Sequence, residues 1–440
     1  MMRRLDTTAA DFEAVFAELV TQNASAEAQV ETRVAAIIQD IKVRGDSALL
    51  EYTRELDQHA PSSAAALEIP AAQMQAALTA LPAQARAALE QAAARITRYA
   101  EAQRDEDWEI SDAQGTRLGQ LVRPLDAVGI YVPGGQAAYP SSVLMNAIPA
   151  RVAGVGQIIM VSPAAGGQLN DWVLAAAALA GVDRLFTIGG AQAVAALAWG
   201  TATIPCVDKI VGPGNAYVAA AKRQVFGQVG IESVAGPSEI LLISDGSGEP
   251  EWAALDLLAQ AEHDQQARAL AMTTDAQWLD AVAAAIERLL PAQPRAEVMR
   301  AALANHGALI KTRSLEEAVA LSNRLAPEHL ELAVAAPRAL LAGVRHAGAV
   351  FLGHYTPEAF GDYCAGSNHV LPTGRCARFA SALGVYDFQK RVSVLEANPA
   401  AARHLAPVAA TLAEAEGLFA HAASARARLD QAGAPATDDE

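Results

Sequence analysis

A carboxylic acid and an imidazole stand next to each other at Glu328 and His329, in the stretch APEHLEL. Neighbouring side chains diverge by roughly 100° on a helix and by roughly 180° on a strand, so the two groups cannot point the same way. One interpretation is an acid/base pair in which each group acts on a different atom. The other is a helix that begins with Pro327 and carries acidic residues in its first turn. The stretch alone does not decide between them.

A second pair, Gln260 and His263, lies three residues apart in LAQAEHDQQ, within a helix that we expect over residues 251–268. Positions i and i+3 share one face of a helix. A glutamine oxygen and an imidazole nitrogen can both bind zinc, but two ligands do not complete a site, and a solvated helix face also explains the pair. Asp362 and His421 are candidates for further ligands only because such residues are few, with nine histidines in the chain.

Three glycine-containing turns each follow an apolar run and precede a helical pattern, in the stretches YVPGGQAAYP, TIGGAQA and IVGPGN. In the last of them, Gly212 and Gly214 would let the backbone approach a phosphate at a helix N-terminus, which attracts negative charge. None of the three is GxGxxG, so the dinucleotide-binding fingerprint is absent. Each could be an ordinary tight turn, but three at the carboxyl ends of successive parallel strands indicate a ligand-binding edge.

The elements that must position these residues alternate between strand and helix in two series, one starting at Val128 and the other at Ser238. Such alternation implies parallel sheets with helical crossovers, and so two α/β domains with a boundary near Gly236–Pro237. Before the first series, residues 25–56 and 71–104 have helical apolar spacing.

Two further segments lie outside these series. Residues 108–125 predict two short strands around a turn at Gly115. After Arg378 the βα pattern stops, and residues 400–429 are mostly helical in pattern. Too few residues follow Arg378 for a large core, so we expect this part to pack on something else.

The composition is that of a globular protein with two or more domains. The chain has 440 residues, of which 52% are hydrophobic and 19% are charged. Its net charge of −16, with no basic stripe, argues against nucleic acid and anionic membranes as partners. Three cysteines without a CxxC pair predict reduced thiols and a cytoplasmic location.

Neither a signal peptide nor a membrane span is expected. The N-terminal MMRRLDTTAADFEAVF has no apolar stretch after its arginines. Residues 185–207 carry no charge, but two adjacent glycines and Pro205 interrupt them. A strand, a turn and a helix therefore explain this segment better than a membrane span does.

Seven segments, in this order, are similar to those of one enzyme family. They are YVPGGQAAYPSSVLMNAIPA, GGAQAVAALAWGT, DKIVGPGNAYVAAAKR, AGPSEILLISD, AQAEHD, APEHLEL and GSNHVLPTGRCARFASALGVYDFQK. From about Arg33 to His421 the sequence resembles histidinol dehydrogenase. The resemblance implies oxidation of L-histidinol through L-histidinal to L-histidine, the last steps of histidine biosynthesis, with two NAD+ used in turn.

The resemblance also implies roles for individual residues, and each position carries the residue type that the family uses. The acid/base pair would be Glu328 and His329. The ligands of one zinc ion per subunit would be Gln260, His263, Asp362 and His421. The NAD+ contacts would be Tyr131, Gln192 and Asn215. The substrate contacts would be Ser238, Gln260, His263, His329, Asp362, Glu416 and His421.

The two oxidations set two tasks for the adjacent acid and imidazole. Alcohol oxidation needs a base for the hydroxyl proton, and a neutral imidazole suits that near pH 7. The aldehyde must then take up water, which needs a base on another side of the carbon. Our hypothesis is that His329 faces the substrate oxygen and Glu328 the attacking water. Zinc would mainly hold the imidazole and amine of histidinol, which fixes the reacting carbon.

The resemblance further implies two incomplete Rossmann-like domains and an intertwined homodimer in which the tail of one subunit completes the site of the other. The N-terminal arm would be residues 1–25. The first α/β domain would be residues 26–129 with 239–382, and the second, NAD-binding domain residues 130–238. The C-terminal dimerisation arm would be residues 383–440.

Three other functions compete with this one. A zinc hydrolase could use the same ligands, with Glu328 activating a metal-bound water, but the glycine-turned βα series argues against it. A two-lobed small-molecule binding protein would also have two α/β domains, and the expected lack of a signal peptide argues against that. A non-catalytic relative should have lost at least one of the site residues.

Overall fold

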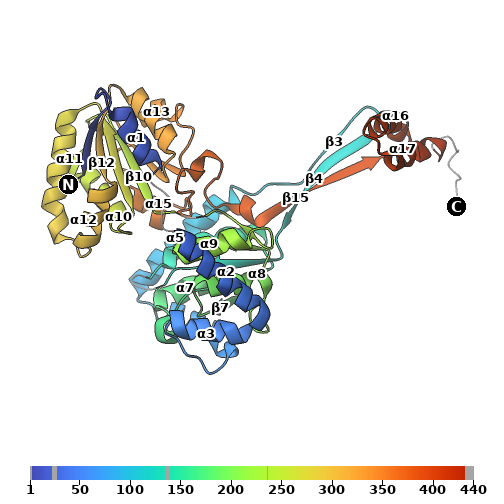
Figure 1. Cartoon of the computed structure of the whole chain (residues 1–440), viewed down its shortest axis with the longest axis horizontal. Helices are drawn as coiled ribbons and strands as arrows, with labels where there is room; N and C mark the ends of the chain where they lie inside the picture. The colour runs from blue at the N-terminus through green and yellow to red at the C-terminus, as the bar shows by residue number, and fades with distance from the viewer. Residues whose placement is uncertain (1, 22–26, 135–137, 235, 432–440) are drawn as a thin grey trace. The chain divides into compact units, whose positions relative to one another are not determined.

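The computed structural model describes residues 2–21, 27–134, 138–234 and 236–431, and the chain divides into two compact units. The first unit is formed by Met1–Gln103 with Leu125–Phe388, and the second by Arg104–Pro124 with Gln389–Glu440. Two six-stranded sheets with helices on both faces make up the first unit, and Figure 1 colours their elements along the chain. The predicted α/β fold class is confirmed.

The first of these sheets, sheet A, is entirely parallel. Its strands, in spatial order, are β1 (Arg3–Asp6), β12 (Ala308–Lys311), β11 (Arg268–Thr273), β10 (Glu239–Ser244), β13 (His329–Ala333) and β14 (Ala349–Leu352). The chain builds outwards from β10 in both directions, so the sheet has a topological switch point between β10 and β13.

Helices bury both faces of sheet A. One face packs against α10 (Pro250–Ala261), α11 (Ala276–Leu289) and α12 (Ala296–His306). The other packs against α1 (Phe12–Thr21) and α13 (Leu315–Leu325), as Figure 1 shows. Two short helices, α14 (Pro337–Leu341) and α15 (Glu358–Tyr363), follow β13 and β14. Strand residues alternate between the two cores because successive side chains point to opposite faces, so Ile240 enters one core and Leu241 the other.

Sheet B repeats this plan with one antiparallel edge strand. Its spatial order is β2 (Glu68–Ile69), β7 (Arg184–Phe186), β6 (Gln157–Val161), β5 (Ala127–Tyr131), β8 (Lys209–Val211) and β9 (Gly230–Ile231). Only β2 runs antiparallel to its neighbour. The switch point lies between β5 and β8, and the predicted glycine turns follow β5, β7 and β8. Gly135 of the first turn lies outside the described residues.

In the described ranges, eight helices cover sheet B, four on each face. One core contains side chains of α4 (Ala71–Ala80), α5 (Ala83–Glu101), α6 (Pro140–Ala153) and α7 (Asp171–Leu179). The other contains side chains of α2 (Glu27–Arg44), α3 (Asp46–Leu56), α8 (Gly190–Trp199) and α9 (Ala216–Val225). The uncharged stretch 185–207 thus contributes β7 and α8, as expected. No helix in the described ranges is long and apolar enough to cross a membrane.

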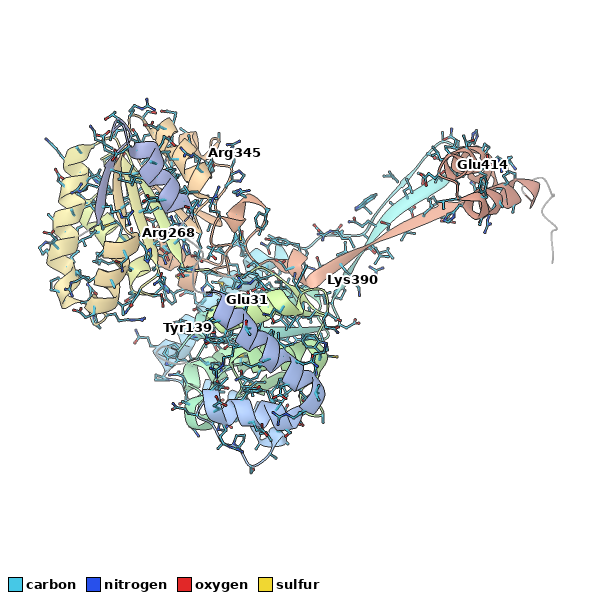
Figure 2. The ribbon with its side chains drawn as sticks, in the orientation of Figure 1. Glu31, Tyr139, Arg268, Arg345, Lys390 and Glu414 are labelled. Atoms are coloured by element: carbon cyan, nitrogen blue, oxygen red, sulfur yellow. The ribbon has the colours of Figure 1, made fainter. Side chains whose placement is uncertain are left out.

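The second unit is an antiparallel sheet followed by two helices. Its strands are β15 (Gln389–Ala397), β4 (Thr116–Pro124) and β3 (Trp108–Ser111), and its helices are α16 (Pro399–Ala415) and α17 (Phe419–Gln431). The two strands expected around Gly115 and the helical segment after residue 400 are confirmed. All residues of β15 after Gln389 are exposed in this chain, and Figure 2 shows Lys390 among the side chains that project from the unit.

Several element boundaries differ from our expectation. The helix expected over 25–56 is two helices, because Gly45 adopts a left-handed φ of 54° between them. The helix expected over 71–104 breaks at Leu81–Pro82, and the one expected over 251–268 ends at Ala261. Strands β1 and β15 were not expected at all.

The two sheets also group the chain differently from the domain boundaries that we expected. Residues 71–101 and β2 pack with sheet B, through α4 on α7, α5 on α6 and β2 beside β7. They therefore do not join residues 239–382, as the expected discontinuous domain required. The start of the chain does join sheet A instead, because β1 pairs with β12.

Candidate active site

The stretch APEHLEL is the start of a strand, so its interpretation as a helix start is wrong. Helix α13 ends at Leu325, and Ala326 adopts a left-handed φ of 49° that turns the chain. His329 is then the first residue of β13, and Glu328 directly precedes it. Extended backbone would send successive side chains to opposite sides, but Glu328 lies in a bend before the strand, and its Oε2 lies 3.7 Å from His329 Nδ1.

The backbone of Glu239, the first residue of β10, forms hydrogen bonds with both Glu328 and His329. The backbone N–H of Glu239 donates to Glu328 Oε2 at 2.8 Å, and His329 Nδ1 lies 3.0 Å from the backbone oxygen of Glu239. Because a carbonyl can only accept, Nδ1 carries the proton of this hydrogen bond. His329 Nε2 is therefore the free nitrogen of the neutral ring. It is buried without a hydrogen-bond partner in the described part of the chain, 3.5 Å from Asp362 Oδ1.

Burial sets the protonation of this cluster. Burial raises the pKa of Glu328 to about 7 and that of Glu358 to about 8, because a charged carboxylate loses its hydration. Burial alone would lower the pKa of His329, but the nearby carboxylates of Glu358, Glu328 and Asp362 outweigh it and raise the pKa well above its ordinary value. The cluster thus places three carboxyl groups within 3.7 Å of one imidazole.

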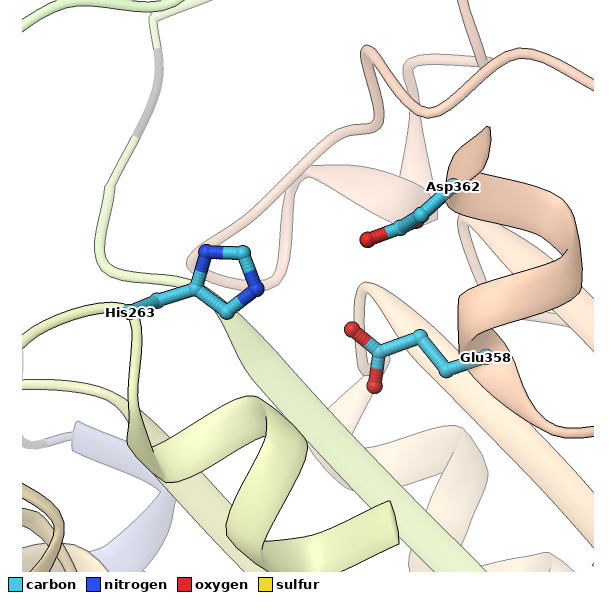
Figure 3. Close-up of side chains that lie close together, drawn as sticks. All are labelled: His263, Glu358 and Asp362. Carbon is cyan, nitrogen blue, oxygen red and sulfur yellow. The ribbon is translucent and has the colours of Figure 1, made fainter. Parts of the chain in front are cut away.

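A group of possible metal ligands adjoins His329. Ligand atoms of His263, Glu358 and Asp362 all lie within 4.8 Å of one another, and Figure 3 shows the imidazole facing the two carboxylates. Glu358 and Asp362 are four residues apart on α15 and so share one face of that helix. His263 lies just beyond the end of α10, where a turn continues the helix: the backbone N–H of His263 donates to the backbone oxygen of Gln260 at 3.3 Å. Both side chains lie beside Glu358, as expected for residues that share one face.

The side chain of Gln260 is fully buried beside this group. Its amide oxygen lies 3.1 and 3.2 Å from the two Glu358 oxygens, which are acceptors, and 3.3 Å from His329 Nδ1. Acceptors at such distances repel unless the amide turns over to donate, or a cation lies among them. Oxygen and imidazole donors in this arrangement suit zinc.

Two further acids, buried Glu331 and half-buried Asp256, join the elements that carry the cluster. Glu331 is the third residue of β13, and its Oε1 accepts a 2.8 Å hydrogen bond from the backbone N–H of Glu358 at the start of α15. Asp256 of α10 makes a side-chain hydrogen bond to Glu331, and burial raises the pKa of Asp256 to about 6. The contacts thus link the helix of Gln260, the strand of His329 and the helix of Asp362.

His369 connects the cluster to an element of the other sheet. Its Nδ1 lies 2.9 Å from the backbone oxygen of Asp362, and its Nε2 lies 3.3 Å from the Ser142 hydroxyl on α6. Ser238, an expected substrate contact, is half-buried and immediately precedes β10. All of these residues lie at the amino ends of sheet A strands or on segments that contact them.

The expected NAD+ contacts lie at the carboxyl ends of sheet B strands. Tyr131 ends β5, and its hydroxyl accepts from the backbone N–H of Gly190 at 3.0 Å. Gln192, in the first turn of α8, donates to Asp57 at 3.2 Å, while its side-chain oxygen is buried without a partner in the described ranges. Asp57 also accepts from the N–H of Gly189 at 3.0 Å, so a carboxylate already occupies this helix N-terminus.

The remaining expected residues are exposed in this chain. Asn215 is the cap of α9, where its Oδ1 accepts from two backbone N–H groups. Glu416 directly follows α16 and His421 lies on α17, both in the second unit. Neither is part of the possible metal-ligand group that the described residues form.

Comparison with known proteins assigns the family. The family model described as histidinol dehydrogenase matches residues 20–429. Histidinol dehydrogenase from Dechloromonas aromatica is 58% identical over 429 residues, covering 98% of this chain and 99% of that protein. The protein of the same name from Bordetella parapertussis is 58% identical over 431 residues, covering 98% of each. The chain belongs to the histidinol dehydrogenase family.

Solved structures agree with this assignment. The crystal structure of histidinol dehydrogenase from Elizabethkingia anophelis superposes with a TM-score of 0.93 at 33% identity, over 98% of this chain and 99% of that one. An acetylating aldehyde dehydrogenase from Geobacillus thermoglucosidasius is similar in fold alone, with a TM-score of 0.50 and 13% identity, over 84% of this chain and 97% of that one. The resemblance to histidinol dehydrogenases seen in the sequence is confirmed.

Sequence reasoning missed four residues around this family site. Glu358 could have been found from its i, i+4 spacing to Asp362, which puts both carboxylates on one helix face. Glu331 is an acid between two leucines of a buried strand, which is unusual unless the acid has a partner. Nothing in the local sequence marks Asp57 or His369, because their contacts come from segments far away in the chain.

Proposed function

We propose that this protein oxidises L-histidinol through L-histidinal to L-histidine, with NAD+ as oxidant and zinc as a required ion. Membership of the histidinol dehydrogenase family supports the substrate. The observation that carries the proposal is the hydrogen bonding of the His329 ring. Its Nδ1 is hydrogen-bonded to a backbone carbonyl, and its Nε2 is buried without a hydrogen-bond partner among the described residues. An imidazole held in this way can accept one proton at a defined nitrogen, as alcohol oxidation requires.

The donor set around His329 supports zinc. We propose Gln260, His263 and Asp362 as ligands from this subunit, and the position of Glu358 makes it a further candidate. When bound, the ion supplies positive charge and coordination positions for the nitrogens of the substrate. Because the surrounding carboxylates raise the pKa of His329, the neutral ring that proton transfer needs depends on such a positive charge nearby.

The two members of the catalytic pair would act on different atoms. His329 Nε2 takes the hydroxyl proton while the carbinol carbon of histidinol loses a hydride, which gives the aldehyde. Glu328 then takes a proton from the water that adds to the aldehyde, and the resulting hydrate anion loses a second hydride to give the carboxylic acid. Two NAD+ accept the two hydrides. Separate hydrogen bonds, one to the N–H and one to the carbonyl oxygen of Glu239, hold the carboxylate and the imidazole in different positions 3.7 Å apart and support this division.

We propose that NAD+ binds at the carboxyl edge of sheet B, with Tyr131, Gln192 and Asn215 as contacts. Ligands of open α/β sheets bind at this edge, next to the switch point. The unpartnered buried oxygen of Gln192 supports a ligand there. Since Asp57 occupies the N-terminus of α8, a cofactor phosphate would bind elsewhere at this edge.

The proposal includes a homodimer in which Glu416 and His421 of one subunit complete the site of the other. The second unit exposes large apolar side chains that a partner surface would cover, namely Leu405, Val408, Leu412, Leu418 and Phe419. Three unpaired cysteines accord with a cytoplasmic enzyme.

The deciding experiment is NAD+ reduction by histidinol, followed by NADH absorbance. We expect two NADH per histidinol, no NADH after chelator treatment and recovery on adding zinc. A metal-dependent hydrolase would give no NADH with any substrate, which would overturn the proposal.

The division of labour is tested with histidinol and histidinal assayed separately. Glu328→Gln should still oxidise histidinol to the aldehyde level but should process histidinal roughly 10²-fold or more slowly. His329→Asn should be slow in the alcohol step as well. Equal losses in both half-reactions for both variants would contradict the separate roles.

A further inference from the structure

A buried ion pair lies behind the glycine turn that follows β8. Lys222 of α9 and Glu232, just after β9, have side chains only 2% and 6% exposed. The ammonium nitrogen of Lys222 lies 2.7 Å from both carboxylate oxygens of Glu232. Such a pair seldom adds stability, because the cost of removing two charges from water offsets their attraction. The rest of this face of α9 is apolar core, which would accommodate an apolar side chain at position 222.

The pair binds both polar backbone groups of a single residue, Gly212. Lys222 Nζ donates to the Gly212 oxygen at 3.1 Å, and Glu232 Oε1 accepts from the Gly212 N–H at 2.8 Å. The two charges thus fix the position and the rotation of one peptide segment, which neither group could do alone.

Gly212 in turn packs on the end of β5. Its φ is 108°, and a Cβ atom at this position would lie 2.1 Å from the backbone oxygen of Tyr131. The same turn ends at Asn215, which caps α9. The location of Gly212 therefore sets the spacing between Tyr131 and Asn215, two of the three residues proposed to contact NAD+.

We propose that Lys222 and Glu232 are positioning residues for the cofactor, which hold the turn 212–215 against the end of β5. This inference rests on the proposed function. Neither side chain needs to touch the cofactor, because both act through the backbone of Gly212. Misplacement of a binding group by about 1 Å can cost up to 10²-fold.

The test compares Lys222→Met, Glu232→Gln and the double variant, with Lys209→Met as the matched control. Lys209 begins β8, whereas Gly212 follows its other end, and Lys209 also pairs with an acid, Asp387, at 3.0 Å. For each protein one measures NAD+ affinity by equilibrium dialysis, the KM for histidinol, zinc content and the Tm.

We expect Lys222→Met to weaken NAD+ binding by about 10-fold or more, with histidinol KM and zinc content within about twofold of wild type. The double variant contains no unpaired buried charge, so its Tm should recover, yet its NAD+ affinity should stay weak because Gly212 has lost its donor. Lys209→Met should bind NAD+ normally.

Two outcomes overturn the inference. A double variant with recovered Tm and wild-type NAD+ affinity would mean that the pair only stabilises the fold. An equal loss of NAD+ affinity in Lys209→Met would mean that any substitution that disturbs β8 weakens NAD+ binding. A wild-type protein that binds no NAD+ would instead overturn the proposed function itself, and the inference with it.

Discussion

Glu328 should make the metal-free protein less stable as the pH rises, and Glu328→Gln should remove that effect. The pKa of Glu328 is raised from 4.5 to about 7 in the folded state by burial. Between these two values the folded protein keeps the proton and the unfolded chain releases it. The unfolded state therefore binds fewer protons, and the free energy of unfolding falls as the pH rises through this window.

The size of the effect follows from the same two values. A difference of about 2.5 pH units corresponds to about 3 kcal/mol at 1.36 kcal/mol per unit. Glutamine does not titrate, and its amide oxygen can still accept from the N–H of Glu239. Relative to wild type, Glu328→Gln should therefore gain about 2 kcal/mol of stability between pH 5 and pH 8.

The assay is urea denaturation of the chelator-treated wild type and variant at pH 5, 6, 7 and 8. Glu317→Gln is the control, because hydrogen bonding to Arg313 lowers the pKa of Glu317 to about 2. Its stabilising contribution is fully present above pH 4.5 and is lost only below, so the control should differ from wild type by a constant amount over this range. A constant difference for Glu328→Gln as well would refute the reasoning, since it would mean that Glu328 is ionised in the folded protein from pH 5 upwards.

Other predictions concern the metal, the assembly and the glycine turn. His263→Asn should bind zinc at least about 10-fold more weakly while keeping its circular dichroism spectrum, and full zinc content in the purified variant would remove His263 from the ligand set. Truncation before Ala400 should abolish histidinol oxidation because it removes Glu416 and His421, so an active truncated protein would contradict the shared site. Leu412→Asp should shift the mass measured by light scattering from that of a dimer towards that of a monomer. An unchanged dimer mass would mean that this exposed face of α16 is not part of the interface. Gly212→Ala should cost more than about 2 kcal/mol in urea denaturation, because its Cβ would clash with the backbone of Tyr131; an unchanged midpoint would rule out that close contact.

The βα series could be predicted because the sequence pattern of each unit is local. An apolar strand, a turn and a helix follow one another within about thirty residues, so the pattern needs no distant partner. Strand β1 has no such pattern, because its partner β12 lies some three hundred residues away and only Arg3–Asp6 take part. Strand β15 also lacks one, since no buried face imposes alternation on its residues in this chain.

The sheet edge at which the cluster around His329 forms is harder to predict from the sequence. The rule for open α/β sheets indicates the carboxyl ends of strands, and in sheet B the glycine turns do lie there. In sheet A, however, Glu328 directly precedes β13, His329 begins it and Ser238 directly precedes β10, so the cluster forms at the amino ends. The sequence APEHLEL contains this information, because the polar pair precedes Leu330, from which apolar residues recur at every second position. The interpretation of the stretch as a helix start hides this order. The structure shows instead that α13 ends at Leu325 and that a left-handed turn at Ala326 leads into β13, which places the pair at the amino end of the strand.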